Sequence, residues 1–370
     1  MKVIHANYEA ERYGIGTYLL NLLEFQKENF KDLQVAVAFN EEGPHTDKFR
    51  NLGIPVYSLR HRTARDSRLL FKFYKVFQPY DIVNLHVSSP LAFFAAKLAG
   101  KKIVFTFHGS LGLKGNSSDV LLKIFHSYLV PKYCDFLTFA SQSAFNVYTR
   151  GRIKVRLSPE KFRIFPYGIQ VKKVVPQRSR DEVRACFGWN SRFLIGTASR
   201  MDPYKRLEYL VQAFSGLDQR DNYSLVIMGT GDKNYENSLR KLVQHLHLSD
   251  RVHFLGYRSD ARDIINSLDL FVLPSGHESF GLALLEAMAL GVPSAVFEDG
   301  GGLVDIIGDS GLVVSSKGEL RDSMKRLKED DSLRNRIRES VRERSKLFDI
   351  SFTAENLFQI YRNLLSNCRS

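Results

Sequence analysis

Cysteine and tryptophan are scarce in this chain, which has three cysteines and one tryptophan in 370 residues. The cysteines lie far apart and show neither metal-ligand spacing nor the density of a disulfide framework: Cys134, Cys186 and Cys368. Their scarcity excludes a disulfide-stabilised secreted domain and favours the reducing cytoplasm. The longest apolar run, residues 91–99, is interrupted by Lys97, and residues 1–10 lack the apolar core of a signal peptide. We therefore expect neither a membrane span nor a cleaved leader.

Acidic residues are in short supply in the first half of the chain only. Residues 1–168 hold 24 Lys and Arg against 13 Asp and Glu, whereas residues 169–370 hold 29 against 27. Nearly all of the net charge of +13 therefore belongs to the first half. Such an excess suggests an anionic partner, either a nucleic acid, an acidic glycan or a phospholipid surface. The alternative is a basic surface that only keeps the protein soluble.

Short runs of β-branched and aromatic residues alternate with helical stretches, a pattern typical of parallel sheets with crossover helices. Twelve strands are predicted, at residues 3–6, 34–39, 82–86, 103–106, 136–140, 163–165, 194–197, 225–228, 252–255, 270–273, 295–297 and 312–314. The charged segment 171–180 contains Pro176 and is interpreted as a linker. We therefore expect an α/β protein with two doubly wound domains, 1–168 and 169–350. The default ligand site is the cleft between them, beyond the carboxyl ends of the strands.

The most informative segment is PSGHESFGLALLEAMALGVP, residues 274–293. A turn after an apolar strand leads into a helix expected to begin near Ser279 or Phe280, and Gly291 with Pro293 ends it. The free N–H groups and the dipole at the start of such a helix suit a phosphate. Carboxylates at Glu278 and Glu286 could accept hydrogen bonds from sugar hydroxyls. The alternative is that Glu278 caps the helix and Glu286 is an exposed helix residue.

Three further patterns follow strand ends. Arg200 and Lys205 come after strand 194–197, where cations could meet a dianionic leaving group. Gly14 and Gly16 precede a helix expected near Thr17, but no third glycine completes a dinucleotide fingerprint. His108 ends the strand at 103–106. Taken singly, each pattern also fits a structural role.

Together these motifs resemble the family 4 retaining glycosyltransferases of the GT-B fold, over essentially the whole chain. The E-x7-E motif of Glu278 and Glu286 carries most of the resemblance, and Arg200 with Lys205 matches the diphosphate-binding pair. The remaining matches are Gly14-x-Gly16, His108-Gly109, the turn from Met228 through Gly229 to Asp232, and the segment Phe254-Leu-Gly256-Tyr257. Tyr167 and Gln170 replace the Asn and Asp of the family's usual Pro-Asn-Gly-Ile-Asp segment.

The resemblance implies that a sugar is transferred from a UDP- or GDP-linked donor with retention of configuration, by a hexosyltransferase-type enzyme. It implies that Glu278 holds hydroxyls of the transferred sugar, that Glu286 binds the ribose, and that His108 contacts the sugar near the reacting centre. The other donor contacts it implies are Gly14, Gly16, Gly229, Tyr257, Ser279, Phe280, Gly281 and Leu282. No Asp-x-Asp motif occurs, so we expect Arg200, Lys205 and a helix terminus to neutralise the diphosphate without a metal or other cofactor. No side chain stands out as a covalent nucleophile, which favours front-face attack.

The acceptor expected from the resemblance is a glycan or a lipid-linked sugar of bacterial-type surface polysaccharide or lipopolysaccharide synthesis. A final amphipathic helix, residues 351–365, is expected to pack back onto the N-terminal domain. Two basic groups, Arg60 to Lys75 and Arg150 to Arg163, predict salt-sensitive binding to the cytoplasmic face of an anionic membrane. The alternative functions are a GT-B nucleotide-sugar epimerase and a basic nucleic-acid-binding protein, and the absence of a nucleic-acid-binding motif argues against the latter.

Overall fold

The structure is a computed structural model, and it describes residues 1–9, 14–60, 67–86, 89–109, 119–150, 155–218 and 220–366. The chain divides into two compact units. Unit 1 comprises residues 1–170 and 350–370, and unit 2 comprises residues 171–349. The division falls two residues after the expected boundary at 168, and the last helix is grouped with unit 1. None of the described helices has the length and apolar character needed to span a bilayer.

Unit 1 is built on a parallel sheet of seven strands in the order β3-β2-β1-β4-β5-β6-β7. The strands are β1 (Lys2–Glu9), β2 (Gln34–Glu41), β3 (Val56–Ser58), β4 (Ile82–Leu85), β5 (Lys102–Phe107), β6 (Phe136–Phe139) and β7 (Phe162–Ile164). The sequence predicted all of these except β3. That edge strand has only three residues, all half-buried, so its pattern is too short to recognise.

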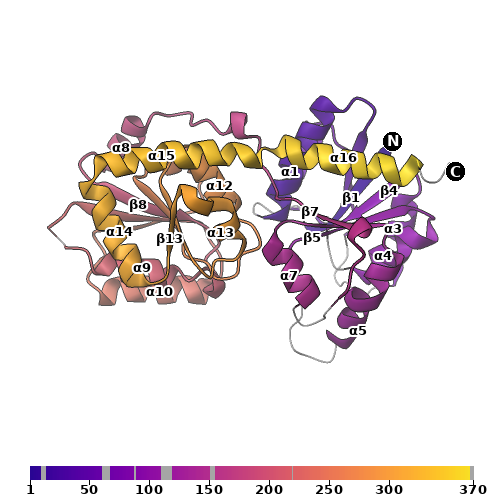
Figure 1. The fold of residues 1–370 in the computed structure, drawn as a ribbon, viewed down its shortest axis with the longest axis horizontal. Coiled ribbons are helices and arrows are strands. Elements are labelled where there is room, and N and C mark those ends of the chain that lie inside the picture. Colours follow the sequence, from indigo (N-terminus) through magenta and orange to yellow (C-terminus); the bar gives the residue numbers. More distant parts are fainter. Residues whose placement is uncertain are drawn as a thin grey trace. The chain divides into compact units, whose positions relative to one another are not determined.

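The helices of unit 1 cover the sheet and include one element from the far end of the chain. They are α1 (Ile15–Asn29), α2 (Thr46–Asn51), α3 (Arg68–Phe77), α4 (Pro90–Leu98), α5 (Asp119–Ile124), a π-helical turn (Phe125–Leu129), α6 (Val130–Tyr133), α7 (Gln142–Arg150) and α16 (Ile350–Ser366). Helix α16 runs beside α1, where the Phe30 and Phe358 rings stack at 4.5 Å (Figure 1). Its Tyr361 hydroxyl accepts a hydrogen bond from buried Asn84 at 2.8 Å. The helical spacing of apolar residues in the sequence places Phe352 on the apolar stripe of this helix together with Leu357 and Tyr361, but Phe352 is half-exposed.

Unit 2 is built on a parallel sheet of six strands in the order β10-β9-β8-β11-β12-β13. The strands are β8 (Phe193–Ala198), β9 (Tyr223–Met228), β10 (Val252–Gly256), β11 (Leu270–Leu273), β12 (Ser294–Phe297) and β13 (Leu312–Val314). All six were predicted. The helices are α8 (Arg180–Phe187), α9 (Leu207–Ser215), α10 (Lys233–His245), α11 (Ala261–Asn266), α12 (Leu282–Ala289), α13 (Gly302–Ile307), α14 (Lys317–Glu329) and α15 (Asp331–Ser345).

Two helix starts differ from those expected. Helix α12 begins at Leu282 rather than near Ser279 or Phe280, because the backbone of residues 276–278 is still hydrogen-bonded to neighbouring loops. Helix α1 begins at Ile15, so Gly16 lies in its first turn and not in the preceding loop. The segment expected as a linker belongs to unit 2: Gln177 N donates to Asp263 Oδ1 at 2.7 Å, and a capping box of Ser179 and Glu182 starts α8.

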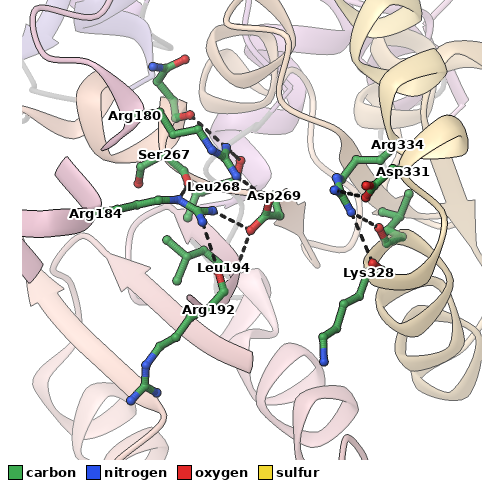
Figure 2. Close-up of polar contacts among 12 residues, drawn as sticks. Arg180, Arg184, Arg192, Leu194, Ser267, Leu268, Asp269, Lys328, Asp331 and Arg334 are labelled. Carbon is green, nitrogen blue, oxygen red and sulfur yellow. Dashed lines mark hydrogen bonds and ion pairs between the residues drawn. The ribbon is translucent and has the colours of Figure 1, made fainter. Parts of the chain in front are cut away.

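An ionic network lies at the amino edge of the unit 2 sheet and joins α8 to the residue before β11 (Figure 2). Asp269, which directly precedes β11, accepts hydrogen bonds from Arg180, from Arg184 at 2.6 Å and from the Leu194 amide at 2.7 Å. The same two arginines donate to the carbonyls of Leu268 and Ser267. A buried carboxylate with this many donors is satisfied within the protein. The network therefore fastens α8 to the amino edge of the sheet.

Both sheets have one point where the strand order reverses. In unit 1 this point lies between β1 and β4, and in unit 2 it lies between β8 and β11. Loops that leave the two central strands here diverge to opposite faces, which opens a crevice where ligands of doubly wound sheets bind. The Gly14, Arg200, Lys205 and Glu278 predictions all fall on loops or helix starts that follow one of these four strands.

Candidate functional site

Glycines hold three loops together at the carboxyl edge of unit 2. The β9 loop passes the β8 loop so closely that a Cβ at Gly229 would lie 1.9 Å from the Ser199 carbonyl oxygen, and one at Gly231 would lie 2.4 Å from that of Met201. Gly229 N also donates to the Gly256 carbonyl at 2.7 Å. Gly229 therefore has a packing role here, and it fixes the start of the segment that carries Arg200 and Lys205.

The loop after β11 is held equally closely by the loop after β12. His277 N donates to the Asp299 carbonyl at 2.9 Å, and Glu278 N donates to the Gly300 carbonyl at 3.0 Å. In return Gly302 N donates to the Glu278 carbonyl at 2.6 Å. A Cβ at Gly302 would lie 2.1 Å from the Ser279 carbonyl oxygen, so only glycine permits this approach. The backbone of Glu278 is thus fixed before any ligand arrives.

Lys205 and Glu278 form the centre of the candidate site. Lys205 lies in a 3₁₀ turn over Pro203–Lys205, is 8% exposed, and donates from Nζ to Glu278 Oε1. Glu278 Oε2 is buried and has no hydrogen-bond partner among the described residues, and the same holds for the hydroxyl of Ser275. A buried carboxylate oxygen without a donor is unfavourable. The candidate site therefore contains a buried carboxylate oxygen, Glu278 Oε2, that lacks a hydrogen-bond donor among the described residues, and the ammonium group of Lys205 lies beside it.

Two arginines of the same loop have different surroundings. Arg200 is 47% exposed at its side chain and donates from Nε to Asp202 at 2.7 Å. Arg206 was not singled out from the sequence, yet it grips Asp299 through two hydrogen bonds of 2.7 Å and donates to the Pro274 carbonyl at 2.9 Å. The hydrogen bond from Arg206 holds the pKa of Asp299 below its ordinary value. Arg206 therefore braces the loops after β8, β11 and β12 against one another.

Glu286 lies on α12 and already has a partner. Arg262 donates to Glu286 Oε1 from Nη2 at 2.9 Å and from Nε at 3.2 Å, and the Glu286 side chain is 21% exposed. Tyr257 follows β10, the edge strand two positions from β8, and is 42% exposed. The remaining predicted donor contacts lead into α12: Ser279, Phe280, Gly281 and Leu282. Gly281 caps that helix, and a Cβ there would lie 2.3 Å from Leu303.

The unit 1 residues lie at the corresponding edge of their own sheet. Gly14 is the N-cap of α1 with φ of 57°, and, its chain neighbours aside, no described residue has an atom within 4 Å of the position of its missing Cβ. His108 directly follows β5, and both of its ring nitrogens have partners within the unit. His86 lies 2.9 Å from Nε2, and the Tyr167 hydroxyl contacts Nδ1. Sequence reasoning missed His5 and His86, whose only signal was their place in or after neighbouring strands.

Two family models match the chain and together span most of its length. The model described as Glycosyltransferase Family 4 matches residues 13–173. The model described as Glycosyl transferases group 1 matches residues 179–344. The first covers most of unit 1, and the second covers most of unit 2, including Arg200, Lys205, Glu278 and Glu286.

Relatives and solved structures agree with these matches. N-acetyl-alpha-D-glucosaminyl L-malate synthase of Bacillus anthracis is 29% identical over 326 residues, which cover 84% of this chain and 83% of the relative. The UDP-Gal:alpha-D-GlcNAc-diphosphoundecaprenol alpha-1,3-galactosyltransferase of Escherichia coli is 26% identical and covers 76% of each chain. HepE from Anabaena, solved with UDP and glucose, has a TM-score of 0.85 at 19% identity, covering 99% of this chain and 100% of its own. The chain therefore belongs to the glycosyltransferases of group 1 and family 4, with the two Rossmann-like units of the GT-B fold.

Proposed function

We propose that this glycosyltransferase moves a hexosyl group from a nucleotide-linked donor to a glycan or lipid-linked acceptor, with retention of configuration. The observation that carries the proposal is the Lys205–Glu278 pair at the strand-order reversal of unit 2, with Glu278 Oε2 buried and unpaired among the described residues. A sugar hydroxyl supplies the donor that this oxygen lacks, and Lys205 lies close enough to meet the phosphate attached to that sugar.

The leaving diphosphate carries the charge that must be stabilised in the transition state. Lys205 contributes a fixed, largely desolvated cation, and Arg200 contributes an exposed guanidinium able to leave Asp202 for a phosphate. The first amides of α12 add donors beside Gly281. In this scheme Glu286 holds the ribose and His108 lies at the reacting centre. The departing phosphate takes the acceptor proton, and no metal or other cofactor is required.

A nucleotide-sugar screen tests the proposal directly. UDP- and GDP-linked hexoses are incubated with the protein, and slow release of nucleoside diphosphate is measured, with a thermal shift as an independent sign of binding. We expect one donor class to be hydrolysed and stabilising, and Glu278→Gln to abolish the release. Release of an epimerised donor without sugar transfer would contradict the proposal. NMR of the product made with a suitable acceptor then reports the anomeric configuration.

We propose further that unit 1 binds the cytoplasmic face of an anionic membrane that carries the acceptor. Helices α3 and α4 pack together, and the ring of Phe93 in α4 lies edge-on to the ring of Phe125 in the π-helical turn, with 5.3 Å between the ring centroids. These adjacent segments expose seven large apolar side chains: Phe71, Phe94, Leu98, Val120, Leu121, Ile124 and Tyr128. Five exposed lysines lie among them: Lys72, Lys75, Lys97, Lys123 and Lys132. We call this set the basic-apolar helical surface.

Exposed apolar side chains with exposed lysines on the same adjacent segments suit an interface of anionic headgroups and acyl chains. The E. coli relative acts, by its name, on a diphosphoundecaprenol-linked sugar, which agrees with a membrane-borne acceptor here. The predicted basic residues Arg62, Arg65, Arg152 and Lys154 lie outside the described residues. Arg60, Arg68 and Arg150 are described and exposed.

Sedimentation with phosphatidylglycerol vesicles tests the membrane proposal. We expect binding at low salt and release at high salt, and at least five-fold weaker binding of the Leu121→Glu/Ile124→Glu variant. Leu347→Glu is the matched control, because Leu347 is 66% exposed but belongs to unit 2. Protein that stays in the supernatant at low salt would contradict the membrane proposal and favour a soluble acceptor.

A further inference from the structure

Three histidine rings and one tyrosine form a continuous row across the carboxyl edge of unit 1. His5 lies in β1, His86 follows β4 and His108 follows β5, and these three strands are neighbours in the sheet. His5 Nδ1 lies 2.9 Å from His86 Nε2, and His86 Nδ1 lies 2.9 Å from His108 Nε2. The Tyr167 hydroxyl contacts His108 Nδ1 at the end of the row. We call these residues the histidine chain.

Three members of the histidine chain are buried and His108 is half-buried, and the three rings have no acidic partner among the described residues. His5 is fully buried, His86 is 4% exposed and Tyr167 is 6% exposed. No carboxylate of the described residues bonds to any of the three rings. Burial lowers the pKa of both His5 and His108 to about 3, and burial with the neighbouring rings lowers the pKa of His86 well below its ordinary value. All three rings are therefore neutral at physiological pH.

A neutral imidazole has one N–H donor and one acceptor nitrogen. Both nitrogens of His86 and both nitrogens of His108 are used within the chain, so the hydrogen positions of all three rings are linked. Moving the hydrogen of one ring to its other nitrogen requires the same change of tautomer in the other two rings. The row therefore has only two hydrogen-bond directions, one that starts at Tyr167 and one that starts at His5.

The free end of the chain selects between these directions. His5 Nε2 is buried and has no hydrogen-bond partner among the described residues. If Tyr167 donated to His108, His5 Nε2 would carry an N–H without an acceptor, and buried donors without acceptors are the rarer kind in proteins. In the opposite direction Nε2 carries only a lone pair. Each histidine then has its hydrogen on Nδ1, and His108 donates to the Tyr167 oxygen.

We propose that His5, His86 and Tyr167 are positioning residues that hold His108 as a neutral Nδ1–H tautomer in one ring orientation. The proposal rests on the role of His108 given under the proposed function. His108 Nε2 accepts the His86 hydrogen, so it cannot gain a proton without breaking that bond. An uncharged ring avoids electrostatic repulsion with the positive charge that develops on the sugar as the leaving group departs. Tyr167 completes the chain, and its ring stacks on Tyr18 at 4.0 Å.

Nitrogen-15 NMR of the full-length protein labelled at histidine tests the chain without any substrate. The signals of His5, His86 and His108 are assigned by comparison with His5→Gln, His86→Gln and Tyr167→Phe variants. We expect three neutral Nδ1–H rings that do not titrate between pH 5.5 and pH 8. An imidazolium at His108, or an Nε2–H tautomer there at pH 7, overturns the proposal whether or not sugar transfer has been detected.

Kinetics then test whether the chain serves the reaction. His86→Leu removes both hydrogen bonds of the middle ring, and Tyr167→Phe removes only the acceptor of His108. We expect each to lower kcat about ten-fold while leaving the KM for the nucleotide sugar within two-fold, because the donor contacts of unit 2 are unchanged. His86→Gln retains one donor and one acceptor and is expected to recover most of kcat.

Tyr80→Phe is the matched control for Tyr167→Phe. It removes another buried tyrosine hydroxyl of unit 1, which donates to Tyr57 at 3.0 Å, and it should leave kcat unchanged. Equal losses in Tyr80→Phe and Tyr167→Phe would overturn the positioning role, as would an unchanged kcat in both Tyr167→Phe and His86→Leu. If no donor supports transfer in the wild-type protein, the proposed function fails, and the NMR experiment alone decides the state of the chain.

Discussion

Unit 1 and unit 2 share a parallel, doubly wound sheet but differ in what they place at the point of strand-order reversal. Unit 2 places a buried ion pair there, Lys205 with Glu278, and leaves one carboxylate oxygen without a described partner. Unit 1 places the histidine chain there, which is neutral and bonded from ring to ring. The same topology thus carries a charged pair of side chains at one edge and a row of histidine rings at the other.

The two units also differ in how the chain builds them. Unit 2 is one continuous segment, whereas unit 1 is completed by α16, which follows unit 2 in the sequence. Polar contacts tie α16 into unit 1, since Thr353 Oγ1 donates to the Pro166 carbonyl at 2.7 Å and Tyr361 bonds to Asn84. The stability of unit 1 therefore depends on residues that follow unit 2 in the sequence, whereas unit 2 is formed by one continuous segment.

The largest expected effect tests this dependence. Leu357 of α16 is fully buried, and Leu357→Ala should lower the free energy of unfolding of unit 1 by about 2–5 kcal/mol, because it leaves a cavity. Phe352→Ala is the matched control on the same helix and should cost far less, since Phe352 is 50% exposed. Urea unfolding followed by hydrogen exchange of unit 1 peptides measures both. Equal losses would show that α16 does not complete the core of unit 1 as described.

The next effect concerns the ion pair of unit 2. Glu278→Ala and Lys205→Ala should each lower kcat by a factor that corresponds to about 2–4 kcal/mol, because each removes a group that is proposed to bind the transition state more strongly than the substrate. Circular dichroism should remain that of the wild type. Arg220→Ala, which removes a fully exposed arginine of unit 2, is the control. Wild-type rates in both site variants would contradict the assignment of this edge as the donor site.

The third effect separates the units by their response to acid. A folded-state histidine pKa of about 3 lies below the unfolded value of 6.5, so the unfolded chain binds more protons between these values, and stability falls as pH falls. Each such histidine lowers the free energy of unfolding by about 2 kcal/mol between pH 7 and pH 5. Among the described residues, unit 1 holds four histidines whose pKa values are lowered by burial, His5, His86, His108 and His126, and unit 2 holds one, His253. The lowered carboxyl pKa values of unit 2, such as that of Asp299, matter only below about pH 4.

Separate probes make the acid experiment decisive. The only tryptophan, Trp189, is buried in unit 2, so its fluorescence reports the unfolding of that unit. Hydrogen exchange of β1 and β5 peptides reports unit 1. We expect unit 1 to lose more stability from pH 7 to pH 5 than the Trp189 transition reports for unit 2, where His253 alone among the described histidines has a lowered pKa, and we expect His5→Gln to reduce the loss in unit 1. Parallel losses in both units would break the contrast between them.

The sequence was sufficient to predict most of the fold and to single out Lys205 and Glu278, the two residues at the centre of the candidate site. Runs such as residues 270–273 and 225–228 are apolar and bounded by turn residues, so they identify strands without any partner. Lys205 and Glu278 were found because they follow strands, and ligands of parallel sheets bind at that edge. The contact between them, across 73 residues, required the strand order that puts β8 beside β11.

What escaped prediction depends on that same strand order. The histidine chain forms because β1, β4 and β5 are neighbours, and one sequence does not fix the order in which strands pair. The Arg206–Asp299 pair joins residues 93 positions apart, so no local pattern reveals it. The start of α12 was misplaced because residues 277 and 278 bond to the loop after β12 instead of entering the helix. Tertiary contacts decided each of these features.

The smallest expected effect distinguishes the two glutamates of unit 2. Glu286 is held by Arg262, and the proposed function assigns it to the ribose, which is present in both the donor and the nucleoside diphosphate product. Glu286→Gln should therefore raise the donor KM and the Ki of the nucleoside diphosphate together, by about ten-fold at most, with kcat nearly unchanged. Glu278→Gln should leave that Ki within two-fold, because Glu278 is assigned to the sugar that the product lacks. Arg262→Met is the control that removes the ion pair but keeps the carboxylate, and it should change the Ki less than Glu286→Gln. A Glu286→Gln variant with an unchanged Ki would show that α12 contributes only its first amides, and that Glu286 and Arg262 form a structural pair.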